Sequence, residues 1–181
     1  LWRLARIGAP SLSPSGAAAV ASVTRHDMAR NRAQASLYLF SLLGEAPRRL
    51  TEAGDQDGAP QWSPAGDCIA FTARRDQGGA KDEAPQHYLI APDGGEARRC
   101  GSVATGVEGI RWFPDGRRIA FVSWVWPRLR TPAAQAKALA DFKARKESAY
   151  VTDELLHRHW DHAVPMGRVP HLHVMDTVTG R

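Results

Sequence analysis

A short turn that returns every 50 residues is the strongest constraint on how this chain can fold. Its three copies begin at positions 13, 63 and 113 and read Ser13-Pro14-Ser15-Gly16, Ser63-Pro64-Ala65-Gly66 and Phe113-Pro114-Asp115-Gly116. A proline in the second position presets φ for a type I turn, and a glycine in the fourth lets the chain enter a new strand. Self-similarity at this period indicates a repeat architecture.

The strand that follows each turn is apolar on both of its faces. In the second repeat, one face carries Ile69, Phe71 and Ala73, and the other carries Cys68, Ala70 and Thr72. A strand with one face in water would alternate apolar and charged residues, whereas a strand covered on both faces reads as this one does. Four-stranded units stacked around an axis meet that condition, so the sequence predicts an all-β fold built from the antiparallel blades of a β-propeller.

The repeat also predicts the parts of each blade. Trp62 and Trp112 precede their turns and are expected on the innermost strand, packed between blades. Polar loops are expected at Thr24–Ala35 and Arg74–Gln86, and a tight hairpin turn at Asp93–Glu96. The expected limits are about 1–54 for blade one, 55–103 for blade two and 104–181 for an incomplete blade three.

Three repeats are fewer than the four to eight blades that normally close a ring. The sequence therefore predicts a partial, open propeller that is a fragment of a longer protein, cut at both ends. Position 1 is Leu, so the N-terminus is expected to be truncated. A signal peptide that preceded it would be lost with it, and the location of the protein, cytoplasmic or periplasmic, stays open.

The third repeat is interrupted by an insertion at about 124–170, roughly 33 residues longer than the repeat requires. Thr131 and Pro132 have the pattern of a helix start, with threonine as the N-cap and proline in the first turn. Asp141 and Arg145 are spaced for an i,i+4 ion pair. The apolar stripe expected on this helix consists of Ala136, Leu139, Ala140 and Phe142. The helix either packs on the rim of the blade or provides a lid or docking surface for another domain.

A dense polar stretch follows the expected helix and has the pattern H-x-H-x-D-H. Its members are His157, His159, Asp161 and His162, which resemble the zinc ligands of metallo-β-lactamase-type hydrolases. Three imidazoles and a carboxylate can ligate zinc with a water left for hydrolysis. The following Ala163-Val164-Pro165 and the blade that resumes afterwards argue against that fold. The favoured interpretation is a polar loop anchored by Trp160, with no metal and no cofactor.

Composition excludes several other classes of protein. The net charge is +5, and the positive residues are spread along the chain, with eight of the 20 arginines in doublets at turns and strand ends, which predicts a solvated surface rather than a nucleic-acid site. No stretch approaches the ~20 apolar residues that a membrane span needs. The two cysteines, Cys68 and Cys100, are expected as small buried apolar side chains rather than a disulfide.

The sequence resembles the N-terminal propeller of the prolyl oligopeptidase family of serine peptidases, in particular its bacterial acylaminoacyl-peptidase and dipeptidyl-peptidase-like branch. The resemblance covers essentially all of the chain. It is carried by four segments: Leu1-Trp2 leading to Pro10, Pro60-Gln61-Trp62-Ser63-Pro64, the insertion with Arg158-His159-Trp160-Asp161, and the exit at His171–Asp176. TolB-like propellers share the blade pattern, and the insertion with its Arg-His-Trp-Asp tract is what favours the peptidase. Ser15 and Ala65 depart from the usual aspartate of the turn and are expected to weaken its capping.

The resemblance implies a two-domain enzyme in which a propeller gates an α/β-hydrolase domain and admits short peptides. The serine, histidine and aspartate that act in such enzymes belong to that second domain, and no serine of this chain lies in a G-x-S-x-G elbow. No catalytic residue is therefore expected here, and the chain alone is expected to hydrolyse nothing. Trp160 and Asp161 are the candidates for shaping the cavity between the domains. The alternatives are a non-catalytic TolB-like interaction platform and, more remotely, a zinc hydrolase.

Overall fold

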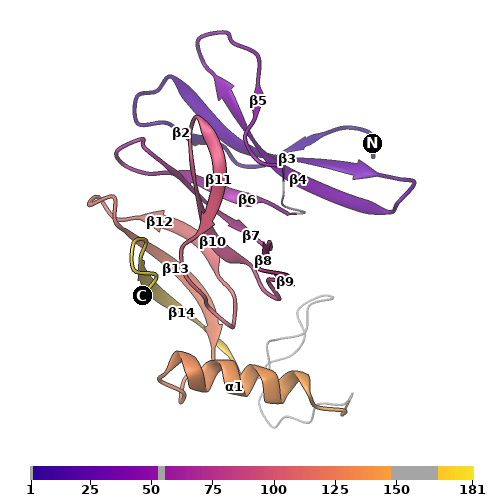
Figure 1. Ribbon diagram of the computed structural model, residues 1–181, viewed down its shortest axis with the longest axis vertical. Coiled ribbons are helices and arrows are strands. Elements are labelled where there is room, and N and C mark those ends of the chain that lie inside the picture. The colour runs from indigo at the N-terminus through magenta and orange to yellow at the C-terminus, as the bar shows by residue number, and fades with distance from the viewer. Residues whose placement is uncertain (1, 53–55, 148–166) are drawn as a thin grey trace.

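The computed structural model describes residues 2–52, 56–147 and 167–181. Within these residues the chain forms three antiparallel sheets side by side, a small two-stranded hairpin, and one helix across the end of the third sheet (Figure 1). None of the described sheets closes on itself. The architecture is that of an open β-propeller fragment with one helical insertion, as the repeat predicted.

The first sheet contains five strands: β1 (Arg6–Ile7), β2 (Ser11–Leu12), β3 (Ala18–Asp27), β4 (Arg32–Ser41) and β5 (Arg48–Arg49). β4 pairs with one edge of β3, and β1 and β2 share the other edge. β1 and β2 therefore act as one interrupted inner strand, and the sheet has the four positions of a blade.

The second sheet has four strands in the order β11-β10-β7-β6. They are β6 (Gly58–Trp62), β7 (Ile69–Ala73), β10 (Gln86–Ala91) and β11 (Gly94–Arg99). The third sheet has three strands in the order β12-β13-β14, namely β12 (Glu108–Trp112), β13 (Arg118–Val125) and β14 (Val169–Asp176). The insertion lies between β13 and β14.

The strand register repeats from sheet to sheet. Ala21 pairs with Tyr38 in the first sheet, Phe71 with Tyr88 in the second and Phe121 with His173 in the third. His173 thus takes the place of Tyr88, 85 residues later instead of 50, and the insertion adds 35 residues where the sequence predicted about 33.

The three proline turns are closed in the same way. Gly16, Gly66 and Gly116 each donate from the backbone N–H to the carbonyl of the first residue of the turn, at 2.9–3.0 Å. All three glycines have φ between 65° and 76°, a region that favours glycine. The turns therefore fix the register of the first two strands of every blade.

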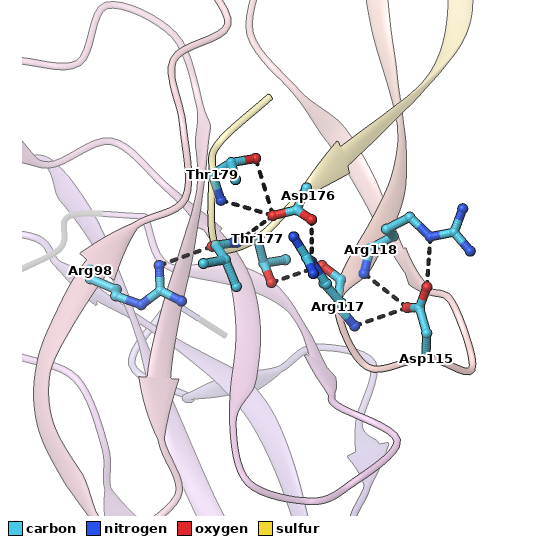
Figure 2. Close-up of polar contacts among 8 residues, drawn as sticks. Arg98, Asp115, Arg117, Arg118, Asp176, Thr177 and Thr179 are labelled. Atoms are coloured by element: carbon cyan, nitrogen blue, oxygen red, sulfur yellow. Dashed lines mark hydrogen bonds and ion pairs between the residues drawn. The ribbon is translucent and has the colours of Figure 1, made fainter.

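The first two turns lack the aspartate of the third turn and are capped by serine hydroxyls instead. The Asp115 carboxylate accepts from the N–H groups of Arg117 and Arg118 in the third turn, as Figure 2 shows. In the other two turns the first residue accepts one of the two equivalent N–H groups: Ser13 Oγ accepts from Ala18 N, and Ser63 Oγ from Cys68 N, at 3.1 and 3.2 Å. In the first turn Ser15 Oγ also accepts from Ala17 N, at 3.4 Å.

The core consists of two apolar layers, one between each pair of neighbouring sheets. The odd-numbered face of β7 enters the first layer, whose buried members are Val20, Leu37, Leu50, Ile69, Phe71, Ala73, Tyr88 and Ile90. The even-numbered face enters the second, whose buried members are Ala70, Leu89, Cys100, Val107, Ile110, Ile119, Phe121 and Met175. This confirms that the central sheet is covered on both faces. Cys68 and Cys100 are free, and burial raises the pKa of Cys100 to about 12.

The first strands of the three sheets lie next to one another. Trp62 packs against the first layer and Trp112 against the second, as predicted. Ser11 Oγ accepts from the Trp62 backbone N–H at 3.1 Å, and Trp112 Nε1 donates to the Gln61 carbonyl at 3.2 Å. Each inner strand is thus bonded to its neighbour at a similar place in the repeat.

Two predicted loops contain more pairing than the sequence indicated. The segment 24–35 continues β3 and β4 as a long hairpin, and the segment 74–86 contains the hairpin of β8 (Asp76–Gln77) and β9 (Ala80–Lys81). The sequence did not predict this pairing, because a hairpin that projects into solvent has no apolar face and its residues are polar on both sides. The β10–β11 turn is centred on Pro92-Asp93, just before the position predicted.

Several arginine doublets are bonded rather than simply solvated. Arg75 and Arg99 form ion pairs with Asp57 and Asp82, at 2.7 and 3.0 Å, and their side chains are only 10% and 23% exposed. The prediction of a solvated surface was wrong for these two residues, because both carboxylates are buried with them.

Candidate functional site

The two ends of the sheets differ in what connects the strands. At one end lie the proline turns and the short β10–β11 turn, and Gly66 of the second turn lies against Pro14 of the first. At the other end, the connections between second and third strands are all extended: the β3–β4 hairpin, the β8–β9 hairpin and the insertion with its helix (Figure 1). We call this second end the elaborated end. Functional residues concentrate on such loops when a rigid scaffold holds them.

The helix α1 (Pro132–Lys143) begins as the sequence predicted. Thr131 is the N-cap, and its Oγ1 accepts from Ala134 N at 3.2 Å. Asp141, however, forms its ion pair with Lys137 at 2.7 Å rather than with Arg145. The lysine lies one turn before the aspartate inside the helix, whereas Arg145 follows the last helical residue.

The buried side chain of α1 is polar, unlike the apolar stripe that the sequence predicted. Gln135 Nε2 donates to the carbonyls of Trp126 and Leu129 at 2.8 and 2.7 Å, and its Oε1 accepts from Trp126 N at 3.0 Å. Ala136 and Ala140, two members of the predicted stripe, are exposed. Gln135 occupies the inward position because the chain that leaves β13 there has backbone groups without strand partners.

Both stems of the insertion are held against the helix by stacked side chains. Trp126 follows β13, Arg168 precedes β14, and the Arg168 guanidinium lies 5.4 Å from the Trp126 ring and 5.9 Å from the Phe142 ring of α1. A guanidinium over an aromatic face contributes about 0.5–1 kcal/mol when exposed. This cluster fixes how the insertion leaves and rejoins the blade.

A cavity of about 230 Å³ lies between α1 and the loops of the second sheet. Its helical wall is formed by Ala136, Leu139, Ala140 and Lys143. Lys143 forms an ion pair with Glu83 on the opposite wall, and this hydrogen bond and charge lower the pKa of Glu83. A second cavity of about 400 Å³, lined by Gln56, Arg74, Lys81, Asp82 and Glu83, shares the acidic pair Asp82 and Glu83 with the first.

The wall of these cavities rests on a buried network of paired charges. Asp82 accepts from the Tyr88 hydroxyl at 2.6 Å and pairs with Arg99 at 3.0 Å. Arg75 pairs with Asp57 and lies 5.1–5.4 Å from the rings of Phe71 and Tyr88. Burial and the hydrogen bond to Asp82 raise the pKa of Tyr88, and burial raises that of Asp57 although Thr51 and Arg75 lower it in part. The network neutralises its own charges and acts as a rigid base.

A second aromatic group joins the second and third sheets. The His87 ring lies edge-on to Phe121 at 5.0 Å, and Phe121 stacks on His173 at 5.5 Å. His87 Nε2 lies 3.1 Å from the Gly109 carbonyl. Burial lowers the pKa of both histidines, so both remain neutral near pH 7.

None of the site residues predicted from the sequence lies in the described part of the chain. Trp160 and Asp161, the candidates for the inter-domain cavity, and His157, His159 and His162 of the zinc hypothesis lie outside the described residues. Over 2–52, 56–147 and 167–181 the structure holds no group of three or more metal-ligating side chains. In the same ranges no helix is long and apolar enough to cross a membrane. The cavity and the charge network were missed because their members are far apart in sequence and follow no motif.

Comparison with solved structures places the fold among β-propellers. An acylaminoacyl peptidase of Pyrococcus horikoshii superposes with a TM-score of 0.70 and 15% identity, over 98% of this chain and 24% of that one. A putative TolB of Agrobacterium tumefaciens superposes with a TM-score of 0.57 and 18% identity, over 98% of this chain and 47% of that one. At these identities the likeness shows the fold alone: the chain is a propeller segment.

Comparison with protein sequences finds relatives that are peptidases. The chain is 28% identical over 161 residues to a dipeptidyl-peptidase 5 of Porphyromonas endodontalis, covering 89% of the chain and 22% of the relative. It is 27% identical over 177 residues to a dipeptidyl-peptidase 5 of Porphyromonas gingivalis, covering 98% of the chain and 24% of the relative. No family model matches the chain. The homologues are thus larger peptidases, and the chain spans about a quarter of their length.

Proposed function

We propose that this chain is the substrate-gating propeller portion of a serine peptidase that cleaves short peptides, as an exopeptidase or an oligopeptidase. The observation that carries the proposal is the similarity to two proteins named dipeptidyl-peptidase 5 over 89% and 98% of the chain. The resemblance of blade pattern and insertion to the prolyl oligopeptidase family supports the same function. In this proposal the three blades have limits near 1–54, 55–103 and 104–181, and an α/β-hydrolase domain elsewhere in the protein supplies the nucleophile.

The physical role of the chain follows from its build. It offers paired charges, stacked rings and backbone-bonded turns, which give rigidity, and it offers extended loops at one end, which give a surface. A rigid wall with loops at one end can limit the size of a substrate that reaches a site beyond it. Within this proposal Trp160 and Asp161 contribute to the wall of the cavity between the domains.

The proposal is tested with the full-length protein that contains this chain. Dipeptide p-nitroanilides with free and acetylated N-termini should be hydrolysed, a serine-directed inhibitor should abolish the turnover, and the chain alone should be inactive. If the full-length protein hydrolyses the dipeptide substrates but does not hydrolyse a small folded protein, this result would support the proposal that the propeller limits substrate size. Absence of any inhibitor-sensitive peptide hydrolysis would favour the non-catalytic TolB-like platform. Trp160→Ala should raise KM, and an unchanged KM would remove Trp160 from the cavity wall.

A further inference from the structure

The described part of the insertion carries a high positive charge for its length. Residues 124–147 contain six cationic and two acidic side chains, a net +4 out of +5 for all 181 residues. The cations are Arg128, Arg130, Lys137, Lys143, Arg145 and Lys146, and all are exposed. The blades, residues 1–123 and 167–181, carry a net +3 spread over 138 residues, and residues 148–166 carry a net −2.

These cations differ in how they are paired. Lys137 and Lys143 form ion pairs with Asp141 and Glu83. Among the described residues, Arg128, Arg130, Arg145 and Lys146 have no carboxylate partner. We call these four residues the basic strip. On the blades, Arg75, Arg99, Arg117 and Arg118 each have one, whereas exposed arginines such as Arg25 and Arg32 form no ion pair among the described residues; the strip differs from these by its local density of charge.

The basic strip follows the length of α1. Arg128 and Arg130 precede the helix, and Arg145 and Lys146 follow it. A helix of 12 residues is about 18 Å long, so the strip can contact several residues of an extended peptide. The Arg145 guanidinium lies 5.5 Å from the Phe142 ring, which holds it in place while the side chain remains exposed.

We propose that the basic strip binds acidic peptides and steers them toward the peptidase site, an inference that rests on the proposed function. Uncompensated cations at one end of a scaffold raise the local concentration of anionic ligands and their association rate. The cavity beside α1, walled by Ala136, Leu139 and Ala140, offers the peptide an adjacent apolar surface. The substrate class is therefore short peptides that carry Asp or Glu outside the scissile bond.

A nucleic acid is the other anionic ligand that a cationic strip could take. Recognition of single strands needs aromatic faces open to stack on bases. The two rings nearest the strip, Trp126 and Phe142, are half-buried and already covered by Arg168 and Arg145. The geometry therefore favours peptide carboxylates over nucleic acid.

The test compares two peptides as substrates of the full-length protein. They are identical except that two Glu residues of one are Gln in the other, and kcat/KM is measured at about 20 mM and about 500 mM salt. In Arg128→Gln/Arg130→Gln/Arg145→Gln we expect kcat/KM for the Glu peptide to fall about fivefold at low salt. The Gln peptide should change less than twofold, and the effect on the Glu peptide should disappear at high salt, where charges are screened within a few ångströms.

The matched control is Arg25→Gln/Arg30→Gln/Arg32→Gln, which removes the same number of charges from the exposed β3–β4 hairpin. It should leave kcat/KM unchanged for both peptides. Equal losses for the Glu and Gln peptides in the strip variant would overturn the inference and indicate that the strip docks a domain instead. So would strip-dependent retention of a DNA oligonucleotide at 150 mM salt without a Glu/Gln difference. If the unmodified protein hydrolyses neither peptide, the proposed function fails together with the inference.

Discussion

Arg98 of the second blade donates from Nη1 to the Thr177 carbonyl of the third blade at 3.0 Å (Figure 2). Arg48, 50 residues earlier, donates to the carbonyls of Pro92 and Asp93, the latter at 3.1 Å. Pro92 and Thr177 each follow the third strand of their sheet directly. The outer strand of one blade is thus bonded to a turn of the next by an arginine at the same repeat position, twice.

We expect Arg98→Ala to lower the free energy of unfolding by about 0.5–1.5 kcal/mol, the usual contribution of one hydrogen bond. Arg48→Ala should cost a similar amount, and the double variant should show the sum, because the two contacts are independent. Urea unfolding of the full-length protein measures the three values. Arg74→Ala, which removes an exposed arginine bonded to Gln56, is the control and should be nearly neutral. No loss in either Arg48 or Arg98 variant would show that these contacts contribute nothing to blade packing.

Ala59 and Gly109 occupy the same repeat position and give a second prediction. Both lie in a bulge of the innermost strand, with φ of 48° and 69°, a region in which an alanine is strained. Ala59→Gly should therefore stabilise the protein and Gly109→Ala should destabilise it, each by about 1 kcal/mol. Thermal unfolding under matched conditions is the measurement. A lower melting temperature for Ala59→Gly would contradict the conformation described for the bulge.

The features that follow from the 50-residue repeat could be predicted from the sequence. The proline turns, the two-faced β7 and the tryptophans of the inner strands follow from local pattern, because each is set by turn chemistry or by alternation of side chains. The start of α1 at Thr131 was also local, since a cap and a proline suffice to define it.

The candidate site was much harder to predict from the sequence. Gln135 is inside because it bonds the chain at Trp126, and Asp82 is buried because Tyr88 and Arg99 surround it. These pairings depend on which strands lie side by side, and hydrophobic patterning alone reads such residues as exposed. The residues proposed from motif, Trp160 and Asp161, lie outside the described part of the chain and stay a prediction.

The buried ion pair of Arg75 and Asp57 gives a third prediction. The Asp57 side chain is fully buried, so Arg75→Met should leave the carboxylate without its ion-pair partner and cost about 3–5 kcal/mol. The double variant Arg75→Met/Asp57→Leu should recover most of that loss, because no buried charge remains. Chemical unfolding of the single and double variants in the full-length protein provides the comparison. A double variant as unstable as Arg75→Met would show that the arginine stabilises mainly by packing on Phe71 and Tyr88.

The pH dependence of stability should depend on His87. Burial lowers its pKa below the ordinary value of about 6.5, and its Nδ1 is buried with no hydrogen-bond partner among the described residues. The unfolded chain therefore binds a proton more readily than the folded one. The contribution of His87 is fully present above about pH 6.5 and is lost as the pH falls through the lower folded pKa.

His87→Leu places at this position the residue that the first blade has at Leu37, and it should flatten the loss of stability between pH 7 and pH 5. Part of the pH dependence of stability should persist in this variant, because burial and the charge of His171 also lower the pKa of His173. Urea unfolding at several pH values measures the slope, with His26→Asn as the matched control on the β3–β4 hairpin. A variant whose stability falls as steeply as that of the unmodified protein would mean that His87 is already free to accept a proton in the folded state. That result would contradict its burial between Phe121 and the Gly109 carbonyl, and with it the packing of the second blade on the third.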